Sequence, residues 1–315
     1  MSPKSWILGA TLATVMALPI SPASAAGETV AVNLYSLSNL FFNFMRQEAL
    51  DEAKKLDIEV IIQDAQASTP KQASDLENAL TQGVDAIVLT PTDVAAIAPA
   101  VDEVIEDDVP VVAVDRRVEG TSKPVPYVTA DNVAGGRLQG EWVTKNMPQG
   151  ARIALITGQI GATTHIDRAK GIHEALTAGG DKYKIVAEQS ADSDRAKALS
   201  VTQNIVTALS SNPPEVFITT DGDTALGAAE ALRGLGLSSK TKVVAFDAYP
   251  DVLKAVKAGE LVGAVEQHGS KQIRTAVQML VDKIRNGTEM KTAIIEPTMI
   301  TTQNLEQAER YSEVK

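Results

Sequence analysis

The chain contains no cysteine among its 315 residues. Disulfide bonds, thiol chemistry and cysteine-ligated metal sites are therefore excluded, and a lipid anchor on an N-terminal cysteine is not expected. Positive charge is also scarce, because 29 lysine and arginine residues stand against 40 aspartate and glutamate residues, for a formal net charge of −11. Without a basic stripe, we expect binding neither to nucleic acid nor to an anionic membrane surface.

The sequence also lacks the common catalytic motifs. No G-x-G-x-x-G follows the first predicted strand, and neither a Walker loop nor a G-x-S-x-G elbow occurs. The three histidines have no metal-ligand spacing, and the pairs Asp192/Asp194 and Asp221/Asp223 do not continue into a calcium loop with a closing glutamate. We therefore predict no catalytic residue, no metal and no cofactor. Carboxylates paired across a cleft leave a glycoside-acting enzyme as a minor alternative.

Long hydrophobic runs are absent except at the N-terminus. Residues 1–26 have one lysine, an apolar run from Trp6 to about Ile20, and a small-residue stretch ending in "ASAA". This layout predicts a signal peptide cleaved after Ala25 or Ala26. A transmembrane anchor is disfavoured, because the run is short and ends in Pro19 and Pro22. The mature protein is then expected free in a periplasm, not lipid-anchored.

Aromatic residues make up only 4% of the chain, yet three of its five phenylalanines lie in "SLSNLFFNF" (36–44). If residues 42–56 are helical, positions 42, 45, 49, 53 and 56 share one apolar face. Phe41 lies off that face, so we expect it to line a cleft. For Phe42, core packing and cleft lining both remain open.

Most of the chain alternates apolar runs with helical patterns. The predicted strands are 29–34, 59–64, 86–90, 111–114, 125–132, 152–157, 184–189, 215–220, 242–246 and 262–267, with an extended tail at 294–300. Continuous valine and isoleucine runs indicate parallel strands that are buried on both faces. The alternation predicts an α/β fold of two doubly wound, parallel-sheet halves.

Ligands of open α/β sheets bind beyond the carboxyl ends of the strands. Charged and amide residues follow most of the predicted strands, including "DRR" (115–117), "TTDGD" (219–223) and "FDAYPD" (246–251). An aspartate carboxylate can accept hydrogen bonds from two ligand hydroxyls at once, and an arginine guanidinium donates hydrogen bonds in a fixed, forked geometry. An aromatic ring can stack on the C–H groups of a sugar. A sugar or polyol is therefore the expected ligand.

Several motifs in order resemble the ribose-type family of periplasmic sugar-binding proteins, the receptors of ABC importers. They are "SNLFFNFM", "ALTQGVDAIVLTPTD", "VPVVAVDRR", "VTADNVAGGRLQGEW", "QSADSDRAKAL", "TTDGDTALGAAEAL", "VVAFDAYPDVLKAV" and "LVGAVEQ", within residues 28–304. The resemblance implies a type I two-lobed fold with a three-strand hinge. It implies an N-terminal lobe of residues 27–130 plus 268–296 and a C-terminal lobe of residues 131–267 plus 297–315. A membrane permease is the implied partner, and a monomer is expected.

The resemblance also implies roles for single residues. Asn39 would bond a hydroxyl, while Phe41 and Phe42 would cover one sugar face. The remaining implied contacts from both lobes are Asp115, Arg116, Asp221, Asp247 and Gln267.

Four positions differ from the ribose pattern. Asp221 falls where the ribose binder has asparagine, and Thr90 replaces an asparagine. Ser193 replaces a stacking phenylalanine, and Ile166 falls where an arginine is expected, although Arg168 is close by. We include Thr90, Ser193 and Arg168 among the expected ligand contacts. These departures favour another monosaccharide, a polyol or a cyclitol over ribose. A receptor of the same fold for a quorum signal or a purine is the alternative.

Overall fold

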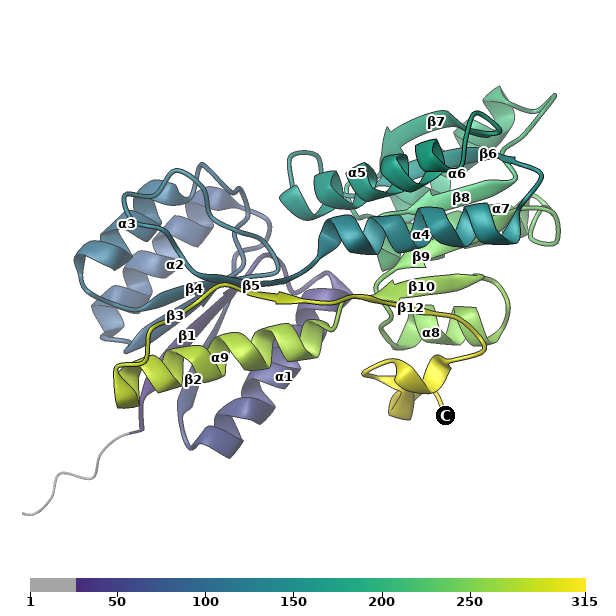
Figure 1. The fold of residues 1–315 in the computed structure, drawn as a ribbon. Helices are drawn as coiled ribbons and strands as arrows, with labels where there is room; N and C mark the ends of the chain where they lie inside the picture. The colour runs from purple at the N-terminus through teal and green to yellow at the C-terminus, as the bar shows by residue number, and fades with distance from the viewer. Residues whose placement is uncertain (1–26) are drawn as a thin grey trace, which may run out of the picture.

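The computed structural model describes residues 27–315, which form two α/β lobes side by side (Figure 1). Each lobe is built on one six-stranded sheet. The predicted signal peptide, residues 1–26, lies outside the described residues. The predicted fold class of two doubly wound lobes is confirmed.

The first sheet has the strand order β11-β5-β4-β3-β1-β2, and all its neighbouring strands are parallel. Its strands are β1 (Thr29–Leu34), β2 (Glu59–Asp64), β3 (Ala86–Leu89), β4 (Val111–Val114), β5 (Tyr127–Ala130) and β11 (Ala293–Ile295). Its helices are α1 (Leu40–Leu56), α2 (Thr69–Gln82), α3 (Ala98–Glu106) and α9 (Gly269–Asn286).

The second sheet has the order β12-β10-β9-β8-β6-β7. Its strands are β6 (Ala151–Thr157), β7 (Tyr183–Ser190), β8 (Val216–Thr219), β9 (Lys242–Phe246), β10 (Gly263–Glu266) and β12 (Thr298–Ile300). Its helices are α4 (Asn132–Asn146), α5 (Thr163–Ala178), α6 (Arg195–Ala208), α7 (Gly222–Gly234) and α8 (Pro250–Lys257), and two 3₁₀ turns, η1 (Leu305–Gln307) and η2 (Tyr311–Glu313), follow β12. The edge strand β12 runs antiparallel to β10, so this sheet is not wholly parallel.

Alternate residues of the central strands enter different cores. Val30 and Val32 of β1 pack with α1 and α9, whereas Ala31 between them packs with α2 and α3. All three are fully buried. Burial on both faces explains why these strands are continuous apolar runs rather than alternating ones.

One predicted helix begins later than expected. The apolar pattern predicts a helix over 95–107, but α3 begins at Ala98. The side chain of Asp93 accepts hydrogen bonds from the backbone N–H groups of Ala95 and Ala96, at 3.0 and 2.8 Å. This local turn satisfies the backbone before the helix starts.

The chain passes between the lobes three times (Figure 1). It leaves the first sheet between β5 and α4, returns between β10 and α9, and crosses again between β11 and β12. Residues that follow central strands of both sheets, Asp115 after β4 and Asp247 after β9, line one cavity. The residue-level lobe boundaries stay a prediction.

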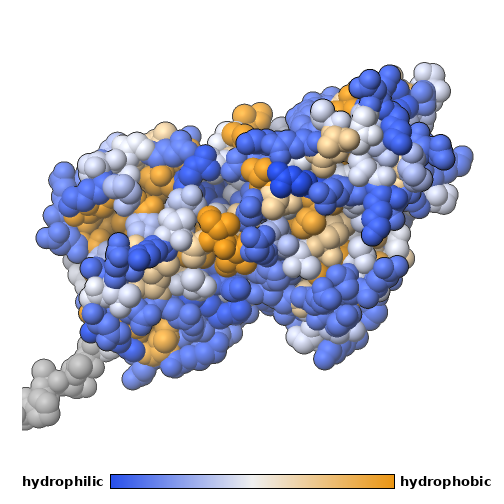
Figure 2. Space-filling view, in the orientation of Figure 1, coloured by the Kyte–Doolittle hydropathy of each residue, from blue (hydrophilic) through white to orange (hydrophobic). Residues whose placement is uncertain are grey.

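The surface shown in Figure 2 is mostly hydrophilic over both lobes, and apolar side chains form small separate groups. Within residues 27–315, no helix combines the length and the apolar character needed to cross a bilayer.

Candidate functional site

A cavity lies between the lobes at the carboxyl ends of the strands. Its empty space is about 340 Å³, which suits a small polar molecule. The lining residues are Tyr35, Asn39, Phe41, Phe42, Asp115 and Arg116 from the first lobe, with Thr164, His165, Arg168, Ser193, Asp221, Asp247 and Gln267 from the second lobe and the hinge. All the sequence-predicted contacts except Thr90 are thus gathered around one cavity. Their contact with a ligand stays a prediction.

Two aspartates occupy corresponding places in the two sheets. Asp115 follows β4 and Asp247 follows β9, and both have left-handed backbones, with φ of 66° and 64°. Aspartate tolerates this conformation better than most residues, because its short polar side chain can bond locally. Both carboxylates are buried, at 4% and 5% exposure. The turn after each strand thus places an aspartate carboxylate, a hydrogen-bond acceptor, at the cavity wall.

Arg116 is the charged donor of the first lobe. Its guanidinium lies 4.3 Å from the centroid of the Tyr35 ring, and its Nε is 3.5 Å from Oδ2 of Asp115. Among the described residues, that Nε has no hydrogen-bond partner. Burial raises the pKa of Asp115, and the Arg116 charge opposes this shift. The pair therefore keeps donor and acceptor capacity for a ligand.

The first-lobe rings and Asn39 occupy the N-terminus of α1. The Oδ1 of Asn39 accepts from the N–H of Phe41 at 2.9 Å and so caps the helix. The rings of Phe41 and Phe42 meet edge to face, with centroids 5.2 Å apart. Phe42 belongs to the α1–α9 core and also lines the cavity, so it has both of the positions considered for it, core packing and cleft lining. Phe41 lines the cavity while packing against that core.

Arg168 is held rigidly in the second lobe. Its Nε donates to Oδ1 of Asn132, its Nη1 to the carbonyl of Thr220 and its Nη2 to Oε1 of Gln267, at 2.8, 2.8 and 3.1 Å. It is 2% exposed, whereas Ile166 on the same helix is 56% exposed. Of these two residues, Arg168 is therefore the one that faces the cavity.

Two carboxylates stand near Arg168. Oδ2 of Asp221 accepts from the hydroxyls of Thr224 and Ser193, at 2.8 and 3.1 Å. Asp247 accepts from Gln267 Nε2 at 2.5 Å. Burial raises the pKa of Asp221, and it raises the pKa of Asp247 to about 7, with the Asp221 charge adding to the Asp247 shift. Asp247 therefore titrates near neutral pH.

Thr90 does not reach the cavity. It follows β3 and is fully buried, and its carbonyl accepts from Gln72 Nε2 at 2.9 Å. Gln72 Nε2 also donates to Oδ1 of Asn33 at 2.7 Å. This polar network lies within the first lobe.

Three lining residues were missed from the sequence: Tyr35, Thr164 and His165. Tyr35 directly follows β1, so the strand-end rule applied to it as much as to Asn39. Thr164 and His165 lie in "GATTHIDR" after β6, where only the arginine was singled out.

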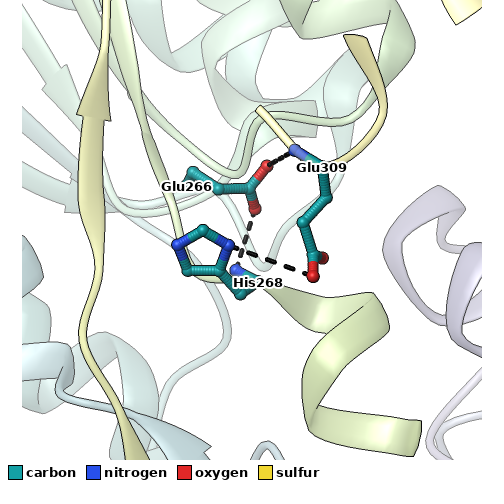
Figure 3. A group of neighbouring side chains, drawn as sticks. All are labelled: Glu266, His268 and Glu309. Carbon is teal, nitrogen blue, oxygen red and sulfur yellow. Dashed lines mark hydrogen bonds and ion pairs between the residues drawn. The ribbon is translucent and has the colours of Figure 1, made fainter. Parts of the chain in front are cut away.

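A second group of titratable side chains lies at the hinge, where Glu266, His268 and Glu309 point toward one another (Figure 3). Each offers one ligand atom, and these atoms lie within 4.8 Å of one another. The carboxylates are already engaged, however. Glu266 accepts from the N–H groups of His268 and Glu309 at 2.8 and 3.3 Å, and Glu309 accepts from those of Ser270 and Lys271 at 3.0 and 3.1 Å. The arrangement caps α9 and ties the C-terminal tail to the hinge.

Comparison with known proteins gives consistent matches over nearly the whole described chain. A family model described as periplasmic binding protein domain matches residues 30–289. The ribose import binding protein of Escherichia coli K12 is 32% identical over 288 residues, covering 90% of this chain and 94% of the relative. That of Bacillus subtilis 168 is 35% identical over 277 residues, covering 87% of each.

Among solved structures, the Caulobacter myo-inositol binding protein bound to myo-inositol superposes with a TM-score of 0.88. It is 45% identical to this chain, and the match covers 93% of this chain and 99% of that one.

Proposed function

The chain belongs to the periplasmic binding protein family, and from that premise we propose that it is the solute-binding protein of an ABC importer. It captures a monosaccharide, polyol or cyclitol in the interlobe cleft and delivers it to a membrane permease. A cyclitol such as myo-inositol is the first candidate, because the relative with 45% identity is a myo-inositol binding protein. The first lobe spans residues 27–130 plus 268–296, and the second spans residues 131–267 plus 297–315.

The chemistry of the cavity is the observation that carries this proposal. Three buried carboxylates accept hydrogen bonds and two buried guanidiniums donate them, which matches the many hydroxyls of an uncharged ligand. Phe41 and Phe42 add an apolar wall for C–H groups.

Ligand capture proceeds by closure of the lobes. Each lobe supplies part of the site, so a bound ligand contacts both only when they close and thereby favours the closed state. A hydroxyl misplaced relative to a buried carboxylate leaves that group unpaired, which costs on the order of 1–3 kcal/mol. The closed shape is what the permease recognises. The protein acts as a monomer, needs no cofactor and carries out no chemical step.

The signal peptide directs the chain to the periplasm and is removed there. Because the chain has no cysteine for lipid attachment, the mature protein diffuses freely in the periplasm and reaches the permease by diffusion.

A thermal-shift screen tests the proposal. Mature protein is heated with inositols, linear polyols, pentoses and hexoses, and with purines as the alternative class. A ligand present at 100 times its dissociation constant adds about 2.7 kcal/mol of stability and raises the melting temperature. A shift with purines alone would overturn the proposal, as would a reaction product formed from the preferred compound. The Asp115→Ala variant, which should lose the shift, is the control.

A further inference from the structure

His165 is buried in the cavity wall and belongs to a chain of hydrogen bonds that joins three separate segments. Its Nδ1 lies 2.9 Å from the hydroxyl of Thr220, and its Nε2 lies 3.3 Å from the hydroxyl of Ser193. The Thr220 hydroxyl also accepts from the N–H of Gly158 at 2.9 Å. At the other end, the Ser193 hydroxyl donates to Oδ2 of Asp221 at 3.1 Å.

The directions of these bonds follow from counting hydrogens. Ser193 has one hydroxyl hydrogen, which goes to the carboxylate of Asp221, so its oxygen accepts from Nε2–H of His165. The neutral imidazole then accepts at Nδ1, and the Thr220 hydroxyl donates to it. Each hydrogen therefore points along the chain toward Asp221. Burial and the charges of Arg168 and Arg116 lower the pKa of His165 well below its usual value, which keeps the ring neutral.

The backbone at Gly158 is shaped for this ring. A Cβ at Gly158 would lie 2.3 Å from Cε1 of His165 and 2.4 Å from Oγ of Ser193. No side chain fits there without displacing both groups. Ser193 itself has a left-handed backbone, with φ of 56°. The imidazole and the serine hydroxyl thus have one well-defined arrangement.

This polarity determines what Ser193 and Asp221, on the second-lobe side of the cavity, offer to a ligand. The hydrogens of Nε2 and of the Ser193 hydroxyl are both consumed within the chain. Ser193 and Asp221 therefore present only acceptor capacity to the cavity. A ligand hydroxyl can donate to them, whereas an ether oxygen would meet them acceptor to acceptor.

We propose that His165 is a positioning residue for specificity, which holds Ser193 and Asp221 as an acceptor-only wall that selects carbocyclic polyols over ring-oxygen sugars. The inference rests on the proposed function and narrows its ligand class. A cyclitol carries a hydroxyl on each ring carbon, so whichever edge faces Ser193 and Asp221 offers a donor. A furanose or pyranose lacks a donor at its ring oxygen.

Calorimetry with myo-inositol and with D-glucose as the ring-oxygen comparison tests this inference. We expect the wild type to bind myo-inositol at least about 10-fold more tightly than D-glucose, since an unmatched buried polar group costs about 1.4 kcal/mol or more. His165→Leu keeps an apolar side chain in place but removes the hydrogen-bond chain, and it should reduce that ratio about 10-fold. His165→Gln supplies an amide donor and a carbonyl acceptor and should retain most of the preference. His173→Gln, an exposed substitution on the same helix, is the matched control.

Equal losses for both ligands in His165→Leu, or no loss, would overturn the inference. If His165→Leu does not fold, Ser193→Ala interrupts the same chain with less disturbance of packing and should likewise reduce the ratio. Nitrogen-15 NMR of labelled histidine reports the protonation state and tautomer of the His165 ring, which a role in packing alone would not determine. A neutral His165 with hydrogen on Nε2 at a pH of about 6 supports the chain, and a charged or Nδ1–H ring overturns it. Failure of the wild type to bind any polyol would instead contradict the proposed function.

Discussion

Arg116 and Gln159 meet across the cleft, where Nη1 of the arginine donates to Oε1 of the glutamine at 3.0 Å. Arg116 follows β4 in the first lobe, and Gln159 follows β6 in the second. Arg117 and Asp167 form a second contact between the lobes, at 3.4 Å. Such bonds exist only when the lobes are close together, so they favour the closed state directly.

The Gln159→Ala variant should therefore bind the ligand less tightly, although Gln159 does not line the cavity. Loss of one hydrogen bond to a charged donor in the closed state costs about 1.5–3 kcal/mol at most. We expect faster ligand dissociation, measured by stopped-flow fluorescence, together with weaker affinity in calorimetry. Gln203→Ala, at an exposed position on α6, is the control. Unchanged affinity and dissociation in Gln159→Ala would show that this bond does not influence closure.

Asp115→Ala or Arg116→Ala should abolish measurable binding without unfolding the protein. Each removes one partner of a buried charged pair at the cavity, at a cost of about 2–4 kcal/mol in binding free energy. Calorimetry gives the affinity, and circular dichroism checks the fold. Arg137→Ala is the control, because Arg137 is exposed and pairs with Glu174 within the second lobe, away from the cavity. An affinity for Asp115→Ala equal to that of the control would refute the site assignment.

Much of the fold could be predicted because its strands are short apolar runs with sharp ends. Residues 111–114 and 242–246 were predicted as strands and are β4 and β9. The direction of β12 could not be predicted. The tail "IIEPTMI" is predicted to be extended. Its partner strand and its direction depend on where the third crossing places it against the second sheet, and local sequence does not encode that position.

The strand-end rule located most of the cavity, since Asp115 and Asp247 follow equivalent strands. It also included Thr90, which is fully buried and is not among the residues that line the cavity. His165 could not be identified in this way, because its role depends on Gly158, Ser193 and Thr220. Hydrogen bonds among segments so far apart in sequence become visible only in three dimensions.

Replacing Phe41 with alanine should weaken binding by about 1–3 kcal/mol, by removing one aromatic wall of the cavity. Leu56→Ala is the control for loss of an apolar side chain from the same helix, because Leu56 packs against the first-lobe core and does not line the cavity. Calorimetry should show the larger loss of affinity in Phe41→Ala. Comparable losses in both variants would indicate that Phe41 acts through helix packing alone.

Gly269→Ala should displace the Phe41 ring. A Cβ at Gly269 would lie 2.5 Å from Cε2 of Phe41, so the phenylalanine must move. We expect weaker binding in calorimetry and little change in circular dichroism. In the double variant Gly269→Ala, Phe41→Ala the additional effect of the alanine at 269 should disappear, because no ring remains to displace. Strictly additive losses would contradict this coupling.

The stability of the ligand-free protein should fall as pH rises, and Glu266 should account for part of that fall. Burial, together with the charge of Glu309, raises the pKa of Glu266 from 4.5 to about 8. Between these values the folded state holds a proton that the unfolded state has released, so the free energy of unfolding decreases with rising pH. The contribution is complete below about 4.5 and is lost as pH passes about 8.

Asp247, with a pKa raised to about 7, acts in the same direction but over a lower range. Urea denaturation of the ligand-free protein at closely spaced pH values measures the free energy of unfolding and separates the contributions of Glu266 and Asp247. Glu266→Gln lowers stability throughout, because one backbone N–H loses its acceptor, yet it should flatten the slope between a pH of about 7 and 8. Each group contributes a slope of up to about 1.4 kcal/mol per pH unit in its window. The exposed Glu306→Gln on the same tail should leave the slope unchanged. If both variants keep the wild-type slope above pH 7, Glu266 is not the group that titrates there.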